Sequence, residues 1–270
     1  MKFVLTIAML SSLAAPLGGQ TRQDLASRPV ARTQQERNDY LAASRSTTGA
    51  GLEAAAANFA QQYPESALRV YLYSEAMQAY ERENNGPRLL AMAEKVLALN
   101  PNHSVALVLT ATALADELDS ADHDRERKID AIKRAANRAI HGIDSGFAPP
   151  AAASPEDIAR YRATLRSMAY SAMGIMRLKT GDDAGAEKDL ATALSLDRVR
   201  PDPALWYHLA LAQDHRKKYS AALNSVEQAL QLASSNPDLQ KLAEIEYDRL
   251  AGLAGRAPRS QSDAGAAIPH

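Results

Sequence analysis

The stretch PALWYHLALAQDHRKKYSAALNSVEQALQLAS, residues 203–234, decides the fold of this chain. Apolar residues recur along it at intervals of three and four, the spacing that gathers them on one face of a helix. Leu205 to Ala210 belong to a first helix, and Tyr219 to Leu230 belong to a second. The stretch therefore predicts a pair of consecutive helices that pack against each other.

The same pattern occurs again 36 residues earlier. This offset aligns Tyr170 with Trp206 and Gly174 with Ala210 in the first helix. In the second helix it aligns Ala186 with Ala222, Leu190 with Val226, and Ala193 with Ala229. A weaker copy ends at Pro101, and residues 52–64 are the expected second helix of a degenerate first copy. One helix pair cannot bury its apolar face alone, so the pattern predicts several stacked pairs.

Small residues mark the expected close approach of the two helices in each pair. Gly174 and Ala210 on the first helices are expected to face Ala186 and Ala222 on the second. Large residues would then fill the gaps between successive pairs, and we expect Trp206 to point into that core.

This pattern resembles the tetratricopeptide repeat (TPR), a helix–turn–helix unit of about 34 residues. The resemblance covers roughly residues 52–253 and implies an all-α fold, a right-handed α-α superhelix that forms a solenoid of stacked helix pairs. The segment FAQQYPES, residues 59–66, also looks like a signature of exported repeat proteins in the outer-membrane β-barrel assembly group. It therefore adds to the case for an exported bacterial TPR protein.

Composition restricts the function classes. Hydrophobic residues make up 46% and charged residues 23% of 270 residues, as in a folded soluble protein, while aromatics are only 5%. The net charge of -1 offers no electrostatic case for a nucleic-acid partner. The absence of cysteine excludes disulfides, thiol catalysis and lipid attachment at an N-terminal cysteine.

The two ends of the chain differ from its helical middle. Lys2, the apolar run 3–10 and the small residues up to Gly19 form the pattern of a signal peptide at 1–20. We therefore expect export to the periplasm or the outside of the cell, and a mature chain with no membrane-spanning segment. A flexible leader at 21–48, with a short helix around 34–43, precedes the repeat domain at 49–254. A disordered tail at 255–270 follows it.

An irregular segment at about 116–156 interrupts the repeats, either as a bend or as a functional insertion. Residues 116–124 are acidic, and the helix expected at 125–144 is basic. The acidic run lacks the alternating acids, central glycine and closing glutamate of a calcium loop. We expect a solvated turn whose acids form weak ion pairs with the basic helix.

The sequence contains no phosphate-binding loop, dinucleotide fingerprint, zinc-protease motif or serine nucleophile elbow. His208 and His215 are seven residues apart and share a helical face, but a metal site needs a third ligand. We expect no catalytic site, no cofactor and no metal.

The expected working surface is the concave groove of the last two pairs. Within it, Tyr207 is the best expected single anchor, because tyrosine is enriched among interface hot spots. Members of the TPR family that clamp a chaperone's C-terminal carboxylate use Lys and Asn at positions that here hold Ser171, Ile175, Tyr207 and Leu211, so that function is not expected. The predicted groove residues are Met168, Ser171, Ile175, Leu178, Lys179, Ala204, Tyr207, Leu211, Asp214 and His215.

The sequence thus predicts a non-catalytic scaffold of the cell envelope that binds a protein or peptide segment in its groove. Two alternatives remain open at this point. The chain could be an accessory domain or subunit of an envelope enzyme or assembly machine, or it could associate with itself as a homo-oligomer.

Overall fold

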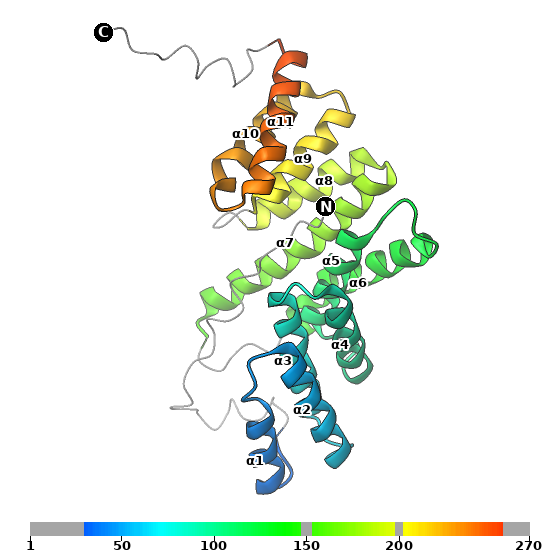
Figure 1. The fold of residues 1–270 in the computed structure, drawn as a ribbon, viewed down its shortest axis with the longest axis vertical. Coiled ribbons are helices and arrows are strands. Elements are labelled where there is room, and N and C mark those ends of the chain that lie inside the picture. The colour runs from blue at the N-terminus through cyan, green and yellow to red at the C-terminus, as the bar shows by residue number, and fades with distance from the viewer. Residues whose placement is uncertain (1–29, 147–152, 198–201, 256–270) are drawn as a thin grey trace, which may run out of the picture. The chain divides into compact units, whose positions relative to one another are not determined.

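The structure is a computed structural model that describes residues 30–146, 153–197 and 202–255. Within these ranges all regular structure is helical, and no strand is present. The predicted all-α fold of repeated helix pairs is thereby confirmed (Figure 1). The predicted signal peptide at 1–20, and the predicted tail beyond Gly255, lie outside the described residues.

The helices follow one another along the chain with short connections. They are α1 (Gln34–Ala43), α2 (Gly49–Gln62), α3 (Arg69–Arg82), α4 (Gly86–Leu99), α5 (Ser104–Glu117), α6 (Arg125–Gly146), α7 (Pro155–Thr180), α8 (Asp183–Leu196), α9 (Pro203–His215), α10 (Tyr219–Leu232) and α11 (Pro237–Leu253), with the 3-10 helix η3 (Ala233–Ser235) before α11.

The described residues divide into two compact units. The N-terminal unit contains residues 30–114, 133–146 and 153–165. The C-terminal unit contains residues 115–132, 166–197 and 202–255. Helices α5, α6 and α7 each contribute residues to both units.

In the N-terminal unit, local capping fixes where the helices begin. The Thr48 hydroxyl accepts the Gly51 N–H at the start of α2, and the Asn85 side chain accepts the Arg88 N–H at the start of α4. Each cap satisfies a backbone donor that the helix itself leaves unpaired. The apolar faces of α3 and α4 then meet in a core that includes the wholly buried side chains of Leu72, Met77, Met92 and Val96.

Helix α1 lies within residues 21–48, which the sequence analysis assigns to a flexible leader with a short helix. It forms over Gln34–Ala43, the range in which the sequence suggested a short helix, and the Thr33 hydroxyl caps its first turn by accepting the Glu36 N–H. The ring of Tyr40 meets the ring of Phe59 in α2 edge-on, with their centroids 6.3 Å apart. Residues 33–43 are therefore part of the N-terminal unit, and α1 is the first helix that the degenerate pair lacked.

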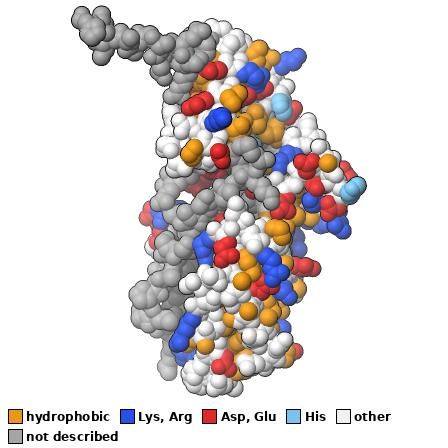
Figure 2. Space-filling model, in the orientation of Figure 1, with side chains coloured by type: hydrophobic (Ala, Val, Ile, Leu, Met, Phe, Trp, Pro, Cys, Tyr) orange, Lys and Arg blue, Asp and Glu red, His pale blue; other side chains and the backbone are white. Residues whose placement is uncertain are grey.

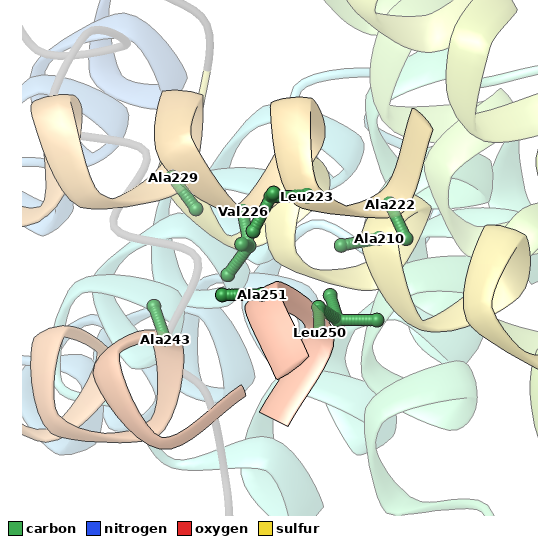
Figure 3. Close-up of a cluster of buried hydrophobic side chains, with 8 residues drawn as sticks. All are labelled: Ala210, Ala222, Leu223, Val226, Ala229, Ala243, Leu250 and Ala251. Atoms are coloured by element: carbon green, nitrogen blue, oxygen red, sulfur yellow. The ribbon is translucent and has the colours of Figure 1, made fainter. Parts of the chain in front are cut away.

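In the C-terminal unit, α9, α10 and α11 share one apolar core (Figure 3). Ala210 of α9 and Ala222 of α10 lie side by side in it, as predicted from their small size (Figure 3). Leu250 and Ala251 of α11 close the core from a third direction. Trp206 packs against this cluster while partly buried, so its predicted place in the core is correct.

Helix α8 approaches Gly174 closely, but through a different residue from the one predicted. A Cβ atom on Gly174 would lie 2.6 Å from the Leu190 Cγ and 3.3 Å from the Leu190 backbone nitrogen. The expected neighbour, Ala186, is not among the closest atoms. The residue that requires glycine on α7 is thus Leu190, one turn further along α8.

The acidic turn between α5 and α6 satisfies its own charges. The Asp122 carboxylate accepts the Asp119 N–H at 2.9 Å and the Lys128 ammonium at 2.9 Å, and the former contact is the largest cause of its lowered pKa. Asp124 pairs with Arg127 at 2.7 Å. The expected ion pairs with the basic helix are therefore present, and the exposed Asp124–Arg127 pair contributes little to stability.

Candidate functional site

Three of the predicted groove residues are not surface residues. Met168, Ser171 and Ile175 of α7 retain only 6%, 2% and 6% of their exposure. One neighbour of this segment is α8, since the Ser167 hydroxyl donates to the Ala193 carbonyl at 2.8 Å. The prediction that these three side chains line an accessible groove is wrong, because packing inside the chain covers them.

The end of α7 shows what its predicted groove face contacts. Lys179, on the same face as Ile175, donates from its ammonium to the carbonyls of Ala115 and Asp116, each at 2.8 Å. These carbonyls belong to the last turn of α5, where a cation is favourable because the helix leaves them unpaired. Arg125 in turn donates to the Lys179 carbonyl at 2.9 Å. The Lys179 ammonium is therefore anchored on the end of α5 within the C-terminal unit, although the residue as a whole stays exposed.

Helix α11 covers part of the predicted groove on α9. The Arg249 guanidinium bridges Asp214 of α9 at 2.5 Å and Glu246 of its own helix at 2.6 Å. Tyr207 is partly buried and packs against the core that α11 closes, and burial raises the pKa of its phenol. Tyr207 and Asp214 are thus engaged inside the unit, which weakens the expectation that Tyr207 is an open anchor.

The remaining groove residues stay accessible. Lys179 and His215 are exposed, while Leu178, Ala204 and Leu211 are half-buried. Figure 2 draws one side of the molecular surface, on which hydrophobic side chains lie among charged ones. The His215 ring approaches the Asp183 carboxylate, with Nδ1 and Oδ1 2.9 Å apart. We call these five residues, Leu178, Lys179, Ala204, Leu211 and His215, the α7–α9 face.

Around Lys179 of this face the fold gathers three further titratable groups that the sequence pattern did not bring together. Burial raises the pKa of Asp116 to about 7, and burial also raises that of Asp202. Burial lowers the pKa of His208 to about 4, and the Lys179 charge lowers it further. These residues come from α5, α7, α9 and the turn before α9, so no single stretch of sequence could show their proximity.

Two of these groups, Lys179 and Asp202, also have a structural task. Lys179 holds the end of α5, and the Asp202 carboxylate caps α9 by accepting the Ala204 N–H at 2.9 Å. His208 is half-buried with its ring Nδ1 shielded from solvent, whereas His215 lies at the surface beside Asp183. Over the described ranges, no group of three or more His, Asp or Glu side chains is arranged to hold a metal ion.

One signal in the sequence could have located α11. The 36-residue offset, carried one step past Trp206, reaches Leu242 in the middle of that helix. A further first helix was therefore predictable after the last complete pair, together with its cover over α9. None of the helices in the described part of the chain is long and apolar enough to cross a membrane.

Comparison with known proteins finds similarity to a solved structure. No family model and no curated protein matches the chain. A thermophilic TPR protein from Thermus thermophilus is similar at 17% sequence identity and a TM-score of 0.43. The match covers 78% of this chain and 98% of that one.

Proposed function

We propose that this chain is a non-catalytic scaffold of the cell envelope that binds a segment of another protein at the α7–α9 face. The face combines half-buried apolar side chains, such as Leu211, with the charged Lys179 and with His215. A surface of this kind can bury apolar area while it fixes the register of a partner through polar contacts.

The observation that carries the proposal is that charged groups around the face are engaged in structural contacts. Lys179 and Asp202 stabilise helix ends, and Asp214 holds α11 through Arg249. A catalytic acid or base needs a substrate within hydrogen-bond reach. Charged groups that are already bonded to backbone atoms or paired with other charges instead make a surface rigid. This favours a role in binding a partner over a role in catalysis.

The envelope part of the proposal rests on the N-terminal pattern of Lys2, the apolar run 3–10 and Gly19. Sequencing the N-terminus of the mature protein tests it. A start near residues 20–23 supports export, whereas an intact Met1 in a cytoplasmic fraction contradicts it.

Site-specific photocrosslinking tests the binding face directly. A photoreactive phenylalanine analogue replaces Leu211 in one variant and Leu232 in the control. Leu232, at the end of α10 in the same unit, is 38% exposed but lies outside the face. The proposal expects a crosslinked protein at position 211 and not at position 232. Equal crosslinking at the two positions, or none at either, would contradict it.

A further inference from the structure

The turn between α3 and α4 contains a chemically reactive pair of residues. Asn85 is followed by Gly86, and this Asn-Gly pair occurs once in the sequence. The backbone nitrogen after an asparagine can attack the side-chain amide carbon, and glycine favours this reaction because it has no Cβ to obstruct the approach. Asn85 is exposed, so water reaches its carboxamide. Whether the pair reacts therefore depends on the conformation of the turn.

Asn85 belongs to two helix ends at once. At the end of α3, its N–H donates to the Tyr80 carbonyl at 2.9 Å, the long-range contact of a Schellman motif. At the start of α4, its carbonyl accepts the Leu89 N–H at 2.9 Å, and its side-chain oxygen accepts the Arg88 N–H at 3.3 Å. The main chain and the side chain of Asn85 are thus both held in place.

These contacts hold Asn85 in a conformation from which the reaction cannot start. Its backbone ψ is 77°. Tetrahedral geometry at Cα then places the Asn85 Cβ nearly trans to the Gly86 nitrogen across the Cα–C bond. Closure of a five-membered ring requires the two atoms on the same side, so ψ must rotate by about half a turn. This rotation moves Gly86 out of α4 and breaks the hydrogen bonds at the start of that helix.

We propose that Asn85 is a site of spontaneous covalent modification, which the folded turn protects and which reacts only when the turn opens. The Gly86 amide gives its proton to hydroxide, and its nitrogen forms a bond to the Asn85 Cγ. The bond from Cγ to Nδ2 breaks, and the side-chain nitrogen leaves as ammonia with a proton taken from water. Water then opens the resulting succinimide at either of its carbonyls, which leaves aspartate or isoaspartate in place of the asparagine.

The two products differ in how they fit the start of α4. Aspartate leaves the main chain unchanged, and its carboxylate can still accept the Arg88 N–H at a helix N-terminus, where negative charge is favourable. Isoaspartate instead routes the main chain through the former side chain and adds one carbon atom to it. The contact with Tyr80 and the cap on Arg88 then lose the spacing that lets both form together. Formation of isoaspartate therefore prevents the turn from closing again.

The chain contains a matched control for this chemistry. Asn236 caps α11 with a similar ψ of 87°, and its side chain accepts the Leu239 N–H at 3.1 Å. Pro237 follows it, and a proline nitrogen in a peptide bond carries no proton and cannot attack. Asn236 is therefore capped in the same way as Asn85 but lacks the nucleophile.

Peptide mapping by mass spectrometry tests the proposal on the full chain after incubation at pH 8. We expect Asn85 to react at least 10-fold faster in denaturing urea than in native buffer, because the folded turn reacts only through local opening. Asn236 should stay unmodified in both conditions. Rates at Asn85 that agree within twofold between the two conditions, or modification of Asn236 equal to that of Asn85 in urea, would overturn the proposal.

Substitutions at Asn84 change the stability of the turn without altering the reacting pair. Asn84 has a φ of 56°, a conformation that glycine adopts freely and alanine does not. In native buffer, Asn85 should therefore react at least threefold faster in Asn84→Ala than in Asn84→Gly, whereas in urea the two variants should react at equal rates. Circular dichroism verifies that both variants are folded. The same ratio of rates in native buffer and in urea would mean that the turn does not control the reaction, and would overturn the proposal.

Discussion

Replacement of Gly174 by alanine tests the geometry of the helix pairs most sharply. In the middle of a helix, alanine is favoured over glycine by about 1 kcal/mol. Here the added Cβ would lie 2.6 Å from the Leu190 Cγ and 3.0 Å from its Cδ2. Leu190 is wholly buried, and its backbone nitrogen is only 3.3 Å from the same Cβ position, so the side chain has little room to move.

The two effects oppose each other, and the packing term should win. Overpacking a dense core typically costs about 1–3 kcal/mol. After the helix-propensity gain is subtracted, we expect Gly174→Ala to lower the free energy of unfolding by about 1 kcal/mol. The larger Gly174→Leu should lower it considerably more, because the leucine needs space that α8 occupies.

Urea unfolding followed by circular dichroism at 222 nm measures this effect. The variants are compared only if the slope of the unfolding free energy against urea concentration is the same in each. Gly252→Ala in α11 is the matched control, because its Cβ meets no atom within 4 Å. The free energy of unfolding of this control variant should be equal to that of the unaltered chain or higher. In a double-mutant cycle, Leu190→Ala should cost less in the Gly174→Ala background than in the unaltered chain. The reasoning is refuted if Gly174→Ala stabilises as much as Gly252→Ala does.

Three further outcomes follow from the C-terminal unit. Trp206→Ala and Tyr207→Ala should both lower the thermal midpoint, because both rings pack on the core shared with α10 and α11, and a loss with Trp206→Ala alone would place Tyr207 outside it. His208 has a folded-state pKa of about 4, below its unfolded value, so the unfolded state takes up the proton first. Stability should therefore fall by about 3 kcal/mol as the pH drops from 6.5 to 4, and urea titrations of His208→Gln should lack this decrease. Asp116 has the opposite effect on the pH dependence of stability, because its folded-state pKa of about 7 lies above the unfolded value. Asp116→Asn should therefore raise the urea midpoint more at pH 8 than at pH 5.

Periodicity in the sequence was sufficient to predict the helix pairs. The spacing in residues 203–234 places α9 and α10, and the offset of 36 residues places α7 and α8. The same information assigned side chains to faces, but it could not say which neighbour covers a face. Ile175 was expected in the groove and is buried.

The remaining differences also arise from contacts between distant segments. The bounds of α1 follow from its local pattern, but its attachment depends on Tyr63 and Ser66, which no periodicity links to Glu36 and Asp39. The proximity of Lys179 to Asp116 depends in the same way on where two helices end. Local rules set the elements, and packing decides which polar groups meet.

Quantitative capture of partners from an envelope fraction tests the central claim, that the α7–α9 face binds protein. Three baits are compared: the unaltered chain, Leu211→Glu in the face, and Leu232→Glu outside it. Mass spectrometry measures what each bait retains, and circular dichroism verifies equal helix content. The account predicts that at least one protein retained by the unaltered chain and by Leu232→Glu is reduced 10-fold or more with Leu211→Glu. Identical retention by all three baits would contradict it.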